Sequence, residues 1–180
     1  MGGKGAAKLC ETVLEHLFGQ VSTQQQEQLL NTFVEIYAQE LCVNTQVYLG
    51  VLPFLDYCQS NDIAMACVTN KPEHLAKGIL DILELSPYFK MVIGGDSLSE
   101  RKPHPLPLLH CMQIHNASAS ETLMIGDSSN DVEAARRAGI DCIVVSYGYN
   151  HGENVHDCQP QQVVDSLVEL LEIDPIRRKA

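Results

Sequence analysis

Short apolar runs alternate with amphipathic segments from Gly50 onwards, and this alternation limits the fold more than any other feature of the chain. The runs have the length of strands and end at turn residues, whereas the amphipathic segments follow a helical period. Strands that alternate with helices need crossover connections, which make the strands parallel and cover both faces of the sheet with helices. The sequence therefore predicts an α/β fold built on a parallel sheet.

The predicted elements divide the chain into two parts. Strands are expected at 63–68, 91–93, 123–125 and 142–146. Helices are expected at 51–60, 71–85, 105–115, 129–138 and 161–173. Residues 6 to about 42 show no strand pattern and are predicted to form two helices, the second of them capped by Ser22 or Thr23. A linker with Asn44, Thr45 and Gly50 follows them.

Charge and cysteine content narrow the class of protein. The 23 acidic and 12 basic residues give a net charge of −11, which argues against a nucleic-acid binder because such a protein needs a basic face. Small phosphorylated molecules remain possible ligands, since a few local cations suffice for them. The seven cysteines are scattered without C-x-x-C spacing, which predicts a reduced, cytoplasmic protein. No apolar stretch is long enough to span a membrane.

Polar residues follow each of the four predicted strands. Their loops are 69–71, 96–105, 127–131 and 147–152. Because ligands of open α/β sheets bind outside the carboxyl ends of the strands, we expect these loops to converge on one crevice. Each motif by itself is also typical of a helix cap or a solvated loop, so the interpretation depends on their common placement.

The residue types suit phosphate chemistry. Thr69 and Asn70 can bond phosphate oxygens at the start of a helix, whose dipole favours an anion. Lys102 supplies positive charge against the negative charge that develops in phosphoryl transfer. Asp127 can bind Mg²⁺, a cation that prefers oxygen ligands and is often shared with a substrate phosphate. Asp131 can anchor a metal-bound water or orient Lys102.

With these motifs in this order, the chain resembles the haloacid dehalogenase-like hydrolases. The resemblance covers about residues 5 to 172 and depends on Thr69-Asn70-Lys71-Pro72, Gly94-Gly95-Asp96, Lys102-Pro103-His104-Pro105, and Ile125-Gly126-Asp127-Ser128 with Asp131. The Lys-Pro-His-Pro form and the segment Tyr147-Gly148-Tyr149-Asn150 are most similar to those of bacterial phosphoglycolate phosphatases.

The resemblance implies a Rossmann-like core and a helical cap. Residues 1–46 then correspond to a partial cap, and residues 47–180 to a core that lacks its first strand. The implied reaction is Mg²⁺-dependent hydrolysis of a phosphate monoester through an aspartyl-phosphate. By motif, Thr69 and Asn70 bind the phosphoryl group, Lys102 stabilises it, Asp127 binds Mg²⁺ and Asp131 supports the site. A small phosphorylated metabolite, 2-phosphoglycolate, is the implied substrate, with neither nucleic acid nor membrane as partner.

The chain departs from the family at the first motif, a strand that ends in Asp-x-Asp. The family implies that its first carboxylate is the nucleophile and its second the general acid, and no Asp-x-Asp occurs in the 180 residues. The chain is therefore expected to be inactive as given. Truncation is the favoured explanation, beside a degraded relative or a substitute segment. Two other functions stay open: another sugar-phosphate phosphatase or phosphomutase of the family, and a non-catalytic phosphate- or metal-binding protein.

Overall fold

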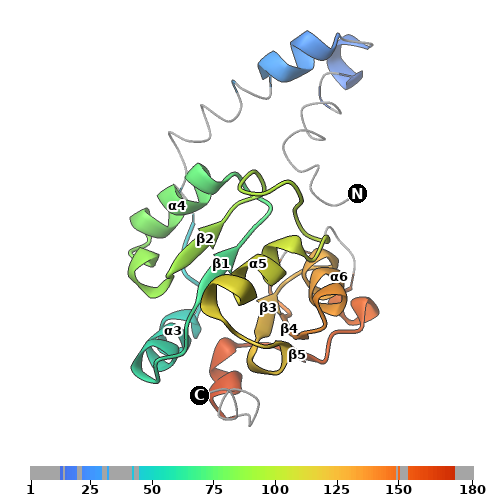
Figure 1. The fold of residues 1–180 in the computed structure, drawn as a ribbon. Coiled ribbons are helices and arrows are strands. Elements are labelled where there is room, and N and C mark those ends of the chain that lie inside the picture. Colours follow the sequence, from blue (N-terminus) through green and yellow to red (C-terminus); the bar gives the residue numbers. More distant parts are fainter. Residues whose placement is uncertain are drawn as a thin grey trace. The chain divides into compact units, whose positions relative to one another are not determined.

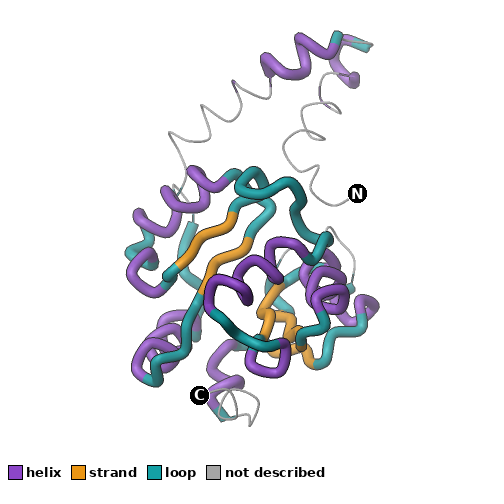
Figure 2. Tube along the Cα trace, viewed as in Figure 1, coloured by secondary structure: helices purple, strands orange, loops and turns teal. Residues whose placement is uncertain are grey.

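The computed structural model divides into two compact units, Met1–Thr45 and Gln46–Ala180. Figures 1 and 2 show the path of the chain. The structure describes residues 13, 15–19, 22–29, 32, 42, 45–148, 150 and 154–172.

The first unit is helical where it is described. Residues 13, 15–18, 23–29 and 32 have helical backbone, and the second run begins after Ser22. The Ser22 hydroxyl accepts a hydrogen bond from the amide of Gln25, whose side chain accepts one from the Ser22 amide in return. These contacts are the capping interaction that the sequence predicted at Ser22. The remaining residues of the two predicted helices lie outside the described residues.

The second unit alternates helices and parallel strands. In chain order its helices and strands are α3 (Val51–Ser60), β1 (Ala66–Val68), α4 (Glu73–Ile82), β2 (Met91–Ile93), α5 (Leu106–His115), β3 (Leu123–Gly126), α6 (Ser129–Ala138), β4 (Asp141–Val145) and β5 (Gln162–Val164). Short 3₁₀ turns lie at Ser86–Tyr88, Ala119–Glu121, Val155–Cys158 and Leu167–Leu171. This order confirms the predicted α/β class.

The five strands form two parallel sheets instead of one. β1 pairs with β2 in the register Cys67 with Val92, and β3, β4 and β5 form the second sheet in that order. The register of the second sheet places Ile143 beside Ile125. Figure 2 shows the two sheets as separate groups of strands within the same unit.

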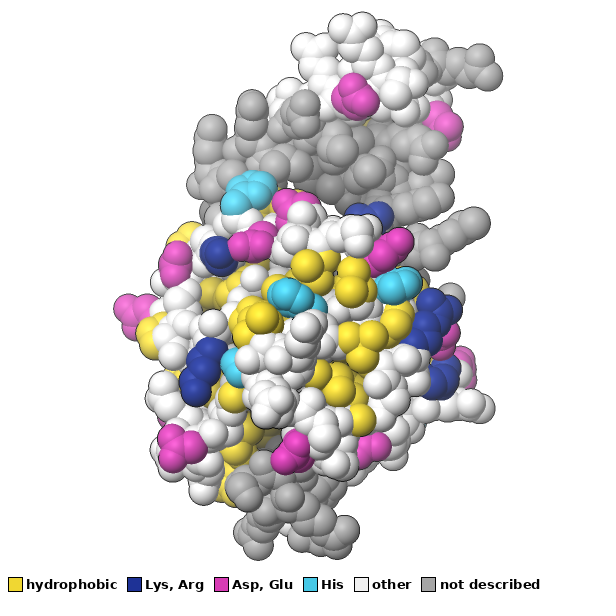
Figure 3. Space-filling view, in the orientation of Figure 1, with side chains coloured by type: hydrophobic (Ala, Val, Ile, Leu, Met, Phe, Trp, Pro, Cys, Tyr) yellow, Lys and Arg dark blue, Asp and Glu magenta, His cyan; other side chains and the backbone are white. Residues whose placement is uncertain are grey.

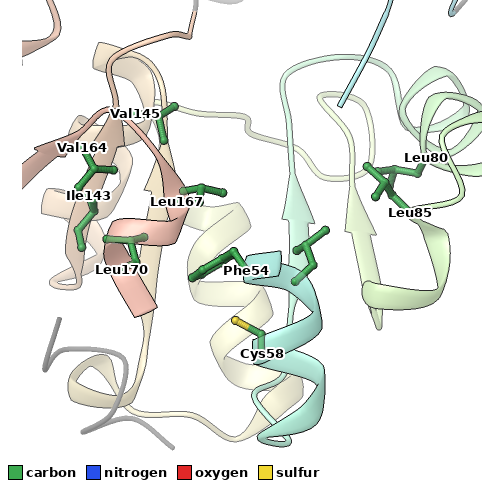
Figure 4. Close-up of a cluster of buried hydrophobic side chains, with 10 residues drawn as sticks. Phe54, Cys58, Leu80, Leu85, Ile143, Val145, Val164, Leu167 and Leu170 are labelled. Atoms are coloured by element: carbon green, nitrogen blue, oxygen red, sulfur yellow. The ribbon is translucent and has the colours of Figure 1, made fainter. Parts of the chain in front are cut away.

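Two apolar clusters hold the second unit together. One joins α3 to strands β4 and β5 and to the turn at Leu167–Leu171; its buried members are Phe54, Leu55, Cys58, Leu80, Leu85, Ile143, Val145, Val164, Leu167 and Leu170. Figure 4 shows Phe54 and Cys58 of α3 between the side chains of the β4–β5 sheet and those of Leu80 and Leu85. The second cluster lies between α5, α6 and the other faces of β3 and β4; its buried members are Leu108, Met124, Val132, Ala134, Ala135, Ile140, Cys142 and Val144. Helices therefore cover both faces of the strands, as predicted.

Helix α5 keeps apolar side chains on its outer surface as well. Leu109 is 42% and Ile114 is 58% exposed. Figure 3 shows hydrophobic side chains gathered over this face of the molecule. Among the residues that the structure describes, no helix is long and apolar enough to cross a membrane.

The predicted closing helix at 161–173 is wrong. Its first part is strand β5, and its second part is the 3₁₀ turn Leu167–Leu171. The Gln161 amide donates to the Cys142 carbonyl at 3.0 Å, so the chain enters the segment already paired with β4. Ser166 then caps the turn together with Glu169. Pairing in the sheet overrides an apolar spacing that also fits a helix, because β-branched residues such as Val163 and Val164 favour a strand.

Candidate functional site

The loop after β1 is held by its own polar side chains. Thr69 accepts a hydrogen bond from the Lys71 amide through its hydroxyl at 3.1 Å, and the Asn70 amide group donates to the Lys102 carbonyl at 2.7 Å. A side chain on Gly95 would collide with the Asn70 carbonyl, so the loop after β2 packs directly against this one. The other side-chain atom of Asn70, Oδ1, is buried without a partner among the described residues. It is an acceptor that remains available for a ligand.

Lys102 is buried at the centre of the site. Only 7% of the residue is exposed, and its Nζ donates to the Val68 carbonyl at 2.5 Å and to Asp131 Oδ1 at 2.6 Å. The peptide bond between Lys102 and Pro103 is cis. One ammonium group thus links the end of β1 to helix α6, and Asn70 holds the backbone that carries it.

Both carboxylate oxygens of Asp131 accept hydrogen bonds from neighbouring residues. Its Oδ1 accepts from Lys102, and its Oδ2 accepts from the amides of Asp127 and Ser128 at 3.0 and 3.1 Å and from the Ser128 hydroxyl at 2.8 Å. Burial alone raises the pKa of the Asp131 carboxyl, but the charge of Lys102 and these hydrogen bonds outweigh burial and lower the pKa overall. Asp131 therefore carries a negative charge at neutral pH and holds the Lys102 ammonium in place.

Asp127 follows β3 directly and is half-buried. A side chain on Gly148 would collide with the Asp127 side chain, so the loop after β4 lies against this carboxylate. Likewise, a Cβ on Gly126 would come within 2.6 Å of Asp131 Oδ2. Both glycines allow a close approach: Gly148 makes room for the Asp127 side chain, and Gly126 makes room for that of Asp131.

Two residues of the quoted motifs were given no function of their own by the sequence analysis. Asn150 is 5% exposed, and its Oδ1 accepts a hydrogen bond from the Ser129 amide at 2.9 Å, which ties the loop after β4 to the first turn of α6. Asp96 accepts from the Glu73 amide at 2.7 Å and so caps α4. The sequence placed both in strand-end loops, but only the structure shows which helix end each one caps.

The structure links three of the four loops that sequence analysis expected to converge, and the fourth, after β4, lies against Asp127. Asn70 contacts the backbone of Lys102, Lys102 contacts Asp131, and Asp131 contacts the backbone of Asp127. Thr69 lies beside Asn70, with its hydroxyl oxygen directed to its own loop. Within the described part of the chain, no three His, Cys, Asp or Glu side chains are grouped so that they could form a protein-only metal cage.

Fold and site together define a class: an α/β protein whose charged side chains lie beyond the carboxyl ends of parallel strands, next to a helix N-terminus. The family model of the haloacid dehalogenase-like hydrolases matches residues 3–145, and the chain belongs to this family.

Named relatives agree with this assignment. The chain is 37% identical over 169 residues to a phosphoglycolate phosphatase of Nitrosococcus oceani, a match that covers 93% of this chain and 75% of the relative. It is 44% identical over 147 residues to a probable phosphoglycolate phosphatase of Pseudomonas putida, covering 81% of this chain but only 57% of that protein. The chain thus spans little more than half of the Pseudomonas protein.

Solved structures show the same fold. A crystal structure of a predicted phosphoglycolate phosphatase from Haemophilus somnus matches with a TM-score of 0.87 and 26% identity, over 93% of this chain and 74% of that one. A putative β-phosphoglucomutase from Thermotoga maritima matches with a TM-score of 0.70 and 22% identity, over 91% of this chain and 76% of that one. At that identity the second likeness concerns the fold alone.

Proposed function

We propose that the loops at 69–70, 102 and 127–131 form the phosphate-binding centre of a phosphoglycolate phosphatase-type hydrolase, with 2-phosphoglycolate as substrate. The observation that carries the proposal is the buried Lys102–Asp131 pair, which is linked to Asn70 on one side and to the backbone of Asp127 on the other. A buried ammonium group costs free energy unless it is paired, and this site pairs it beside a potential metal ligand. Such an arrangement suits an anionic ligand.

Each residue contributes a separate interaction. An ammonium group has three donor hydrogens, and two of those of Lys102 meet Val68 and Asp131, so the third is available to a phosphate oxygen. The Asn70 Oδ1 atom can accept from a ligand hydroxyl or a metal-bound water. Asp131 is a positioning residue, because both of its oxygens are already engaged.

The residues present fit a magnesium ion that is shared with the substrate. Mg²⁺ is commonly held by one or two carboxylates, water molecules and substrate phosphate oxygens. Asp127 would supply one half-buried carboxylate, whereas Asp131 is already paired with Lys102. When bound, the ion neutralises phosphate charge and polarises the phosphoryl group.

We further propose that these 180 residues bind phosphate esters without turning them over. A covalent mechanism needs a carboxylate that attacks phosphorus and an acid that protonates the leaving alcohol. The family's Asp-x-Asp motif would supply both groups, and the chain contains no such motif. Asp127 cannot act as nucleophile while it binds the metal ion.

Residues 1–46 are proposed to be part of a helical cap that selects the substrate, and residues 47–180 to be the core that holds the phosphoryl group. We also propose that the protein acts in the cytoplasm, since its seven scattered cysteines fit a reducing compartment.

The test is calorimetric titration of the purified chain with 2-phosphoglycolate and with inorganic phosphate, each with and without Mg²⁺. Lys102→Met should weaken binding about tenfold or more, because a hydrogen bond to a charged group is lost. The matched control is Lys77→Met, which removes an exposed lysine whose side chain is 55% accessible and should leave binding unchanged. Equal affinities for the wild type and Lys102→Met would contradict the proposal.

A parallel assay for released phosphate addresses turnover. We expect none from the purified chain with Mg²⁺, and magnesium-dependent release that Lys102→Met abolishes would refute the proposed inactivity. Binding without turnover is equally the property of a non-catalytic phosphate-binding protein, the second candidate function, which the intact Lys102–Asp131 pair also supports. Adding a segment with Asp-x-Asp distinguishes these two functions. Recovered hydrolysis supports the enzyme, and continued absence of hydrolysis supports the binding protein.

A further inference from the structure

Two tyrosine rings link the first residues of the second unit to the loop after β4. The ring centroids of Tyr48 and Tyr147 lie 4.5 Å apart, and the ring planes make an angle of 41°. A tilted pair at this separation attracts through the charge distribution of the rings, in addition to the apolar area that it buries. The contact therefore joins two segments that are far apart in the sequence.

Tyr48 lies at the surface, in a segment that is anchored on both sides of it. Tyr48 is 58% exposed, and the next residue, Leu49, is 95% exposed. Val47 packs against the apolar cluster around α3. Gly50 lies against the residue that follows β5 by two positions, since a Cβ on Gly50 would come within 2.5 Å of Ser166 Oγ. Because most of the Tyr48 ring stays in solvent, this ring adds little apolar area to the core.

Tyr147 lies between a fixed strand end and the glycine that adjoins Asp127. The preceding residue, Ser146, is fixed to the loop after β5, because its hydroxyl donates to Asp165 at 2.6 Å. The following residue, Gly148, is so close to Asp127 that a Cβ on this glycine would lie 2.0 Å from the Asp127 Cβ atom. A change in the direction of the chain at Tyr147 would therefore be felt directly at the Asp127 side chain.

Backbone pairing stops just before this point of the chain. Among the described residues, the last ladder bond between β4 and β5 is made by the Ser146 amide, which donates to the Val164 carbonyl at 2.9 Å. Beyond the ladder, side-chain contacts have to hold the loop, and segments without regular pairing open most readily. The Tyr147 ring packs against the α3 cluster on one side and on Tyr48 on another. The Tyr48 ring thus restricts the backbone that continues to Gly148.

We propose that Tyr48 is a positioning residue for the magnesium site, because it holds Tyr147 and, through Tyr147 and Gly148, restricts where the Asp127 carboxylate lies. The inference rests on the proposed function, which assigns the metal ion to Asp127. When only a fraction of the molecules holds a binding group in the competent position, the apparent affinity falls by that fraction. Displacement of the Tyr48 ring therefore weakens Mg²⁺ binding, and by linkage the bound ion stabilises the ring contact by the same factor.

The ring contact also limits the size of the effect. The interaction in an aromatic pair corresponds to about a two- to tenfold change in an equilibrium constant. A contact cannot transmit more free energy than it contains. Removal of the Tyr48 ring should accordingly raise the dissociation constant of Mg²⁺ by about two- to tenfold, without abolishing binding.

Titration of the full chain with magnesium chloride, followed by the amide resonances of Asp127 and its neighbours in ¹H–¹⁵N NMR spectra, tests the proposal. Tyr48→Ala should raise the dissociation constant of Mg²⁺ by about two- to tenfold. Tyr48→Phe keeps the ring and should retain the wild-type value. Leu49→Ala is the matched control, because it removes a more exposed side chain from the same segment and should also leave the affinity unchanged.

Backbone relaxation of the metal-free chain gives a second measurement, which does not depend on the proposed function. The Gly148 amide of the wild type should show the order parameter of a rigid backbone, about 0.85, and that of Tyr48→Ala should fall toward about 0.6. Tyr48→Phe and Leu49→Ala should keep the wild-type value. A ring that serves only stability would lower the free energy of unfolding of Tyr48→Ala and leave the Mg²⁺ affinity and the Gly148 order parameter unchanged, because both are measured in the folded chain.

The two measurements separate failure of the inference from failure of the proposed function. If the wild type binds Mg²⁺ and Tyr48→Ala binds it equally well, the positioning role is refuted and the metal site stands. An unchanged Gly148 order parameter in Tyr48→Ala, or equal weakening of Mg²⁺ binding by Leu49→Ala, would refute the positioning role as well. If the wild type does not bind Mg²⁺ at millimolar concentration, the proposed metal site is refuted, and the positioning role with it.

Discussion

Replacing Lys102 by methionine should lower the free energy of unfolding by about 3 kcal/mol, which is the lower end of the range for a broken buried ion pair. The side chains of Lys102 and Asp131 are only 9% and 4% exposed, so the loss would leave a carboxylate in the interior without its counter-charge. The lower end applies because Asp131 keeps three hydrogen bonds, from the amides of Asp127 and Ser128 and from the Ser128 hydroxyl.

Urea unfolding of Lys102→Met, Asp131→Asn and the double variant measures this energy as a double-mutant cycle. The double variant should lose less than the sum of the single losses, by about 1 to 3 kcal/mol, because it leaves no lone buried charge. Lys77→Met is the control, since the Lys77–Glu73 pair is exposed and should contribute less than about 1 kcal/mol. Strictly additive losses, or a Lys102→Met loss no larger than that of the control, would refute the reasoning.

Acid should destabilise the wild type through Asp131. The pKa of Asp131 is lowered in the folded state, so its contribution to the free energy of unfolding is complete above the ordinary pKa of 3.8 and disappears as the pH falls through the lowered pKa. Asp131→Asn should therefore reduce the dependence of the unfolding free energy on pH in acid, as measured by chemical unfolding. An unchanged pH dependence would contradict the assignment. Gly148→Ala should weaken Mg²⁺ binding measured by calorimetry, because the new methyl group would displace Asp127; an unchanged affinity would show that the loop after β4 does not position this carboxylate. Leu170→Ala should lower the free energy of unfolding by about 2 to 5 kcal/mol, since Leu170 is fully buried. Ile114→Ala is the control and should lower it by less than about 1 kcal/mol, because Ile114 is 58% exposed. Similar losses for the two variants would place Leu170 outside the core.

Local patterns in the sequence predicted most elements of the second unit. The helix predicted at 129–138 has the same bounds in the structure, where Gly139 ends it in the left-handed conformation and Ser128 begins it with a capping box. The same local information misplaced the segment after Gln161, since the spacing of its apolar residues fits a helix as well as a strand followed by a turn. Only pairing with β4 decides between these two, and that partner lies about twenty residues earlier in the chain.

The sequence by itself determined the residue types and their order: an Asn after the first strand, a Lys in a proline-rich loop after the second and two Asp residues after the third. These features are local in the chain, because they depend only on which residues follow each strand in the sequence. The tertiary structure alone decided that Asp131 holds Lys102 while the Asp127 side chain lies beside Gly148. It also decided that the strands divide into two parallel sheets, because pairing joins strands that are distant in the sequence.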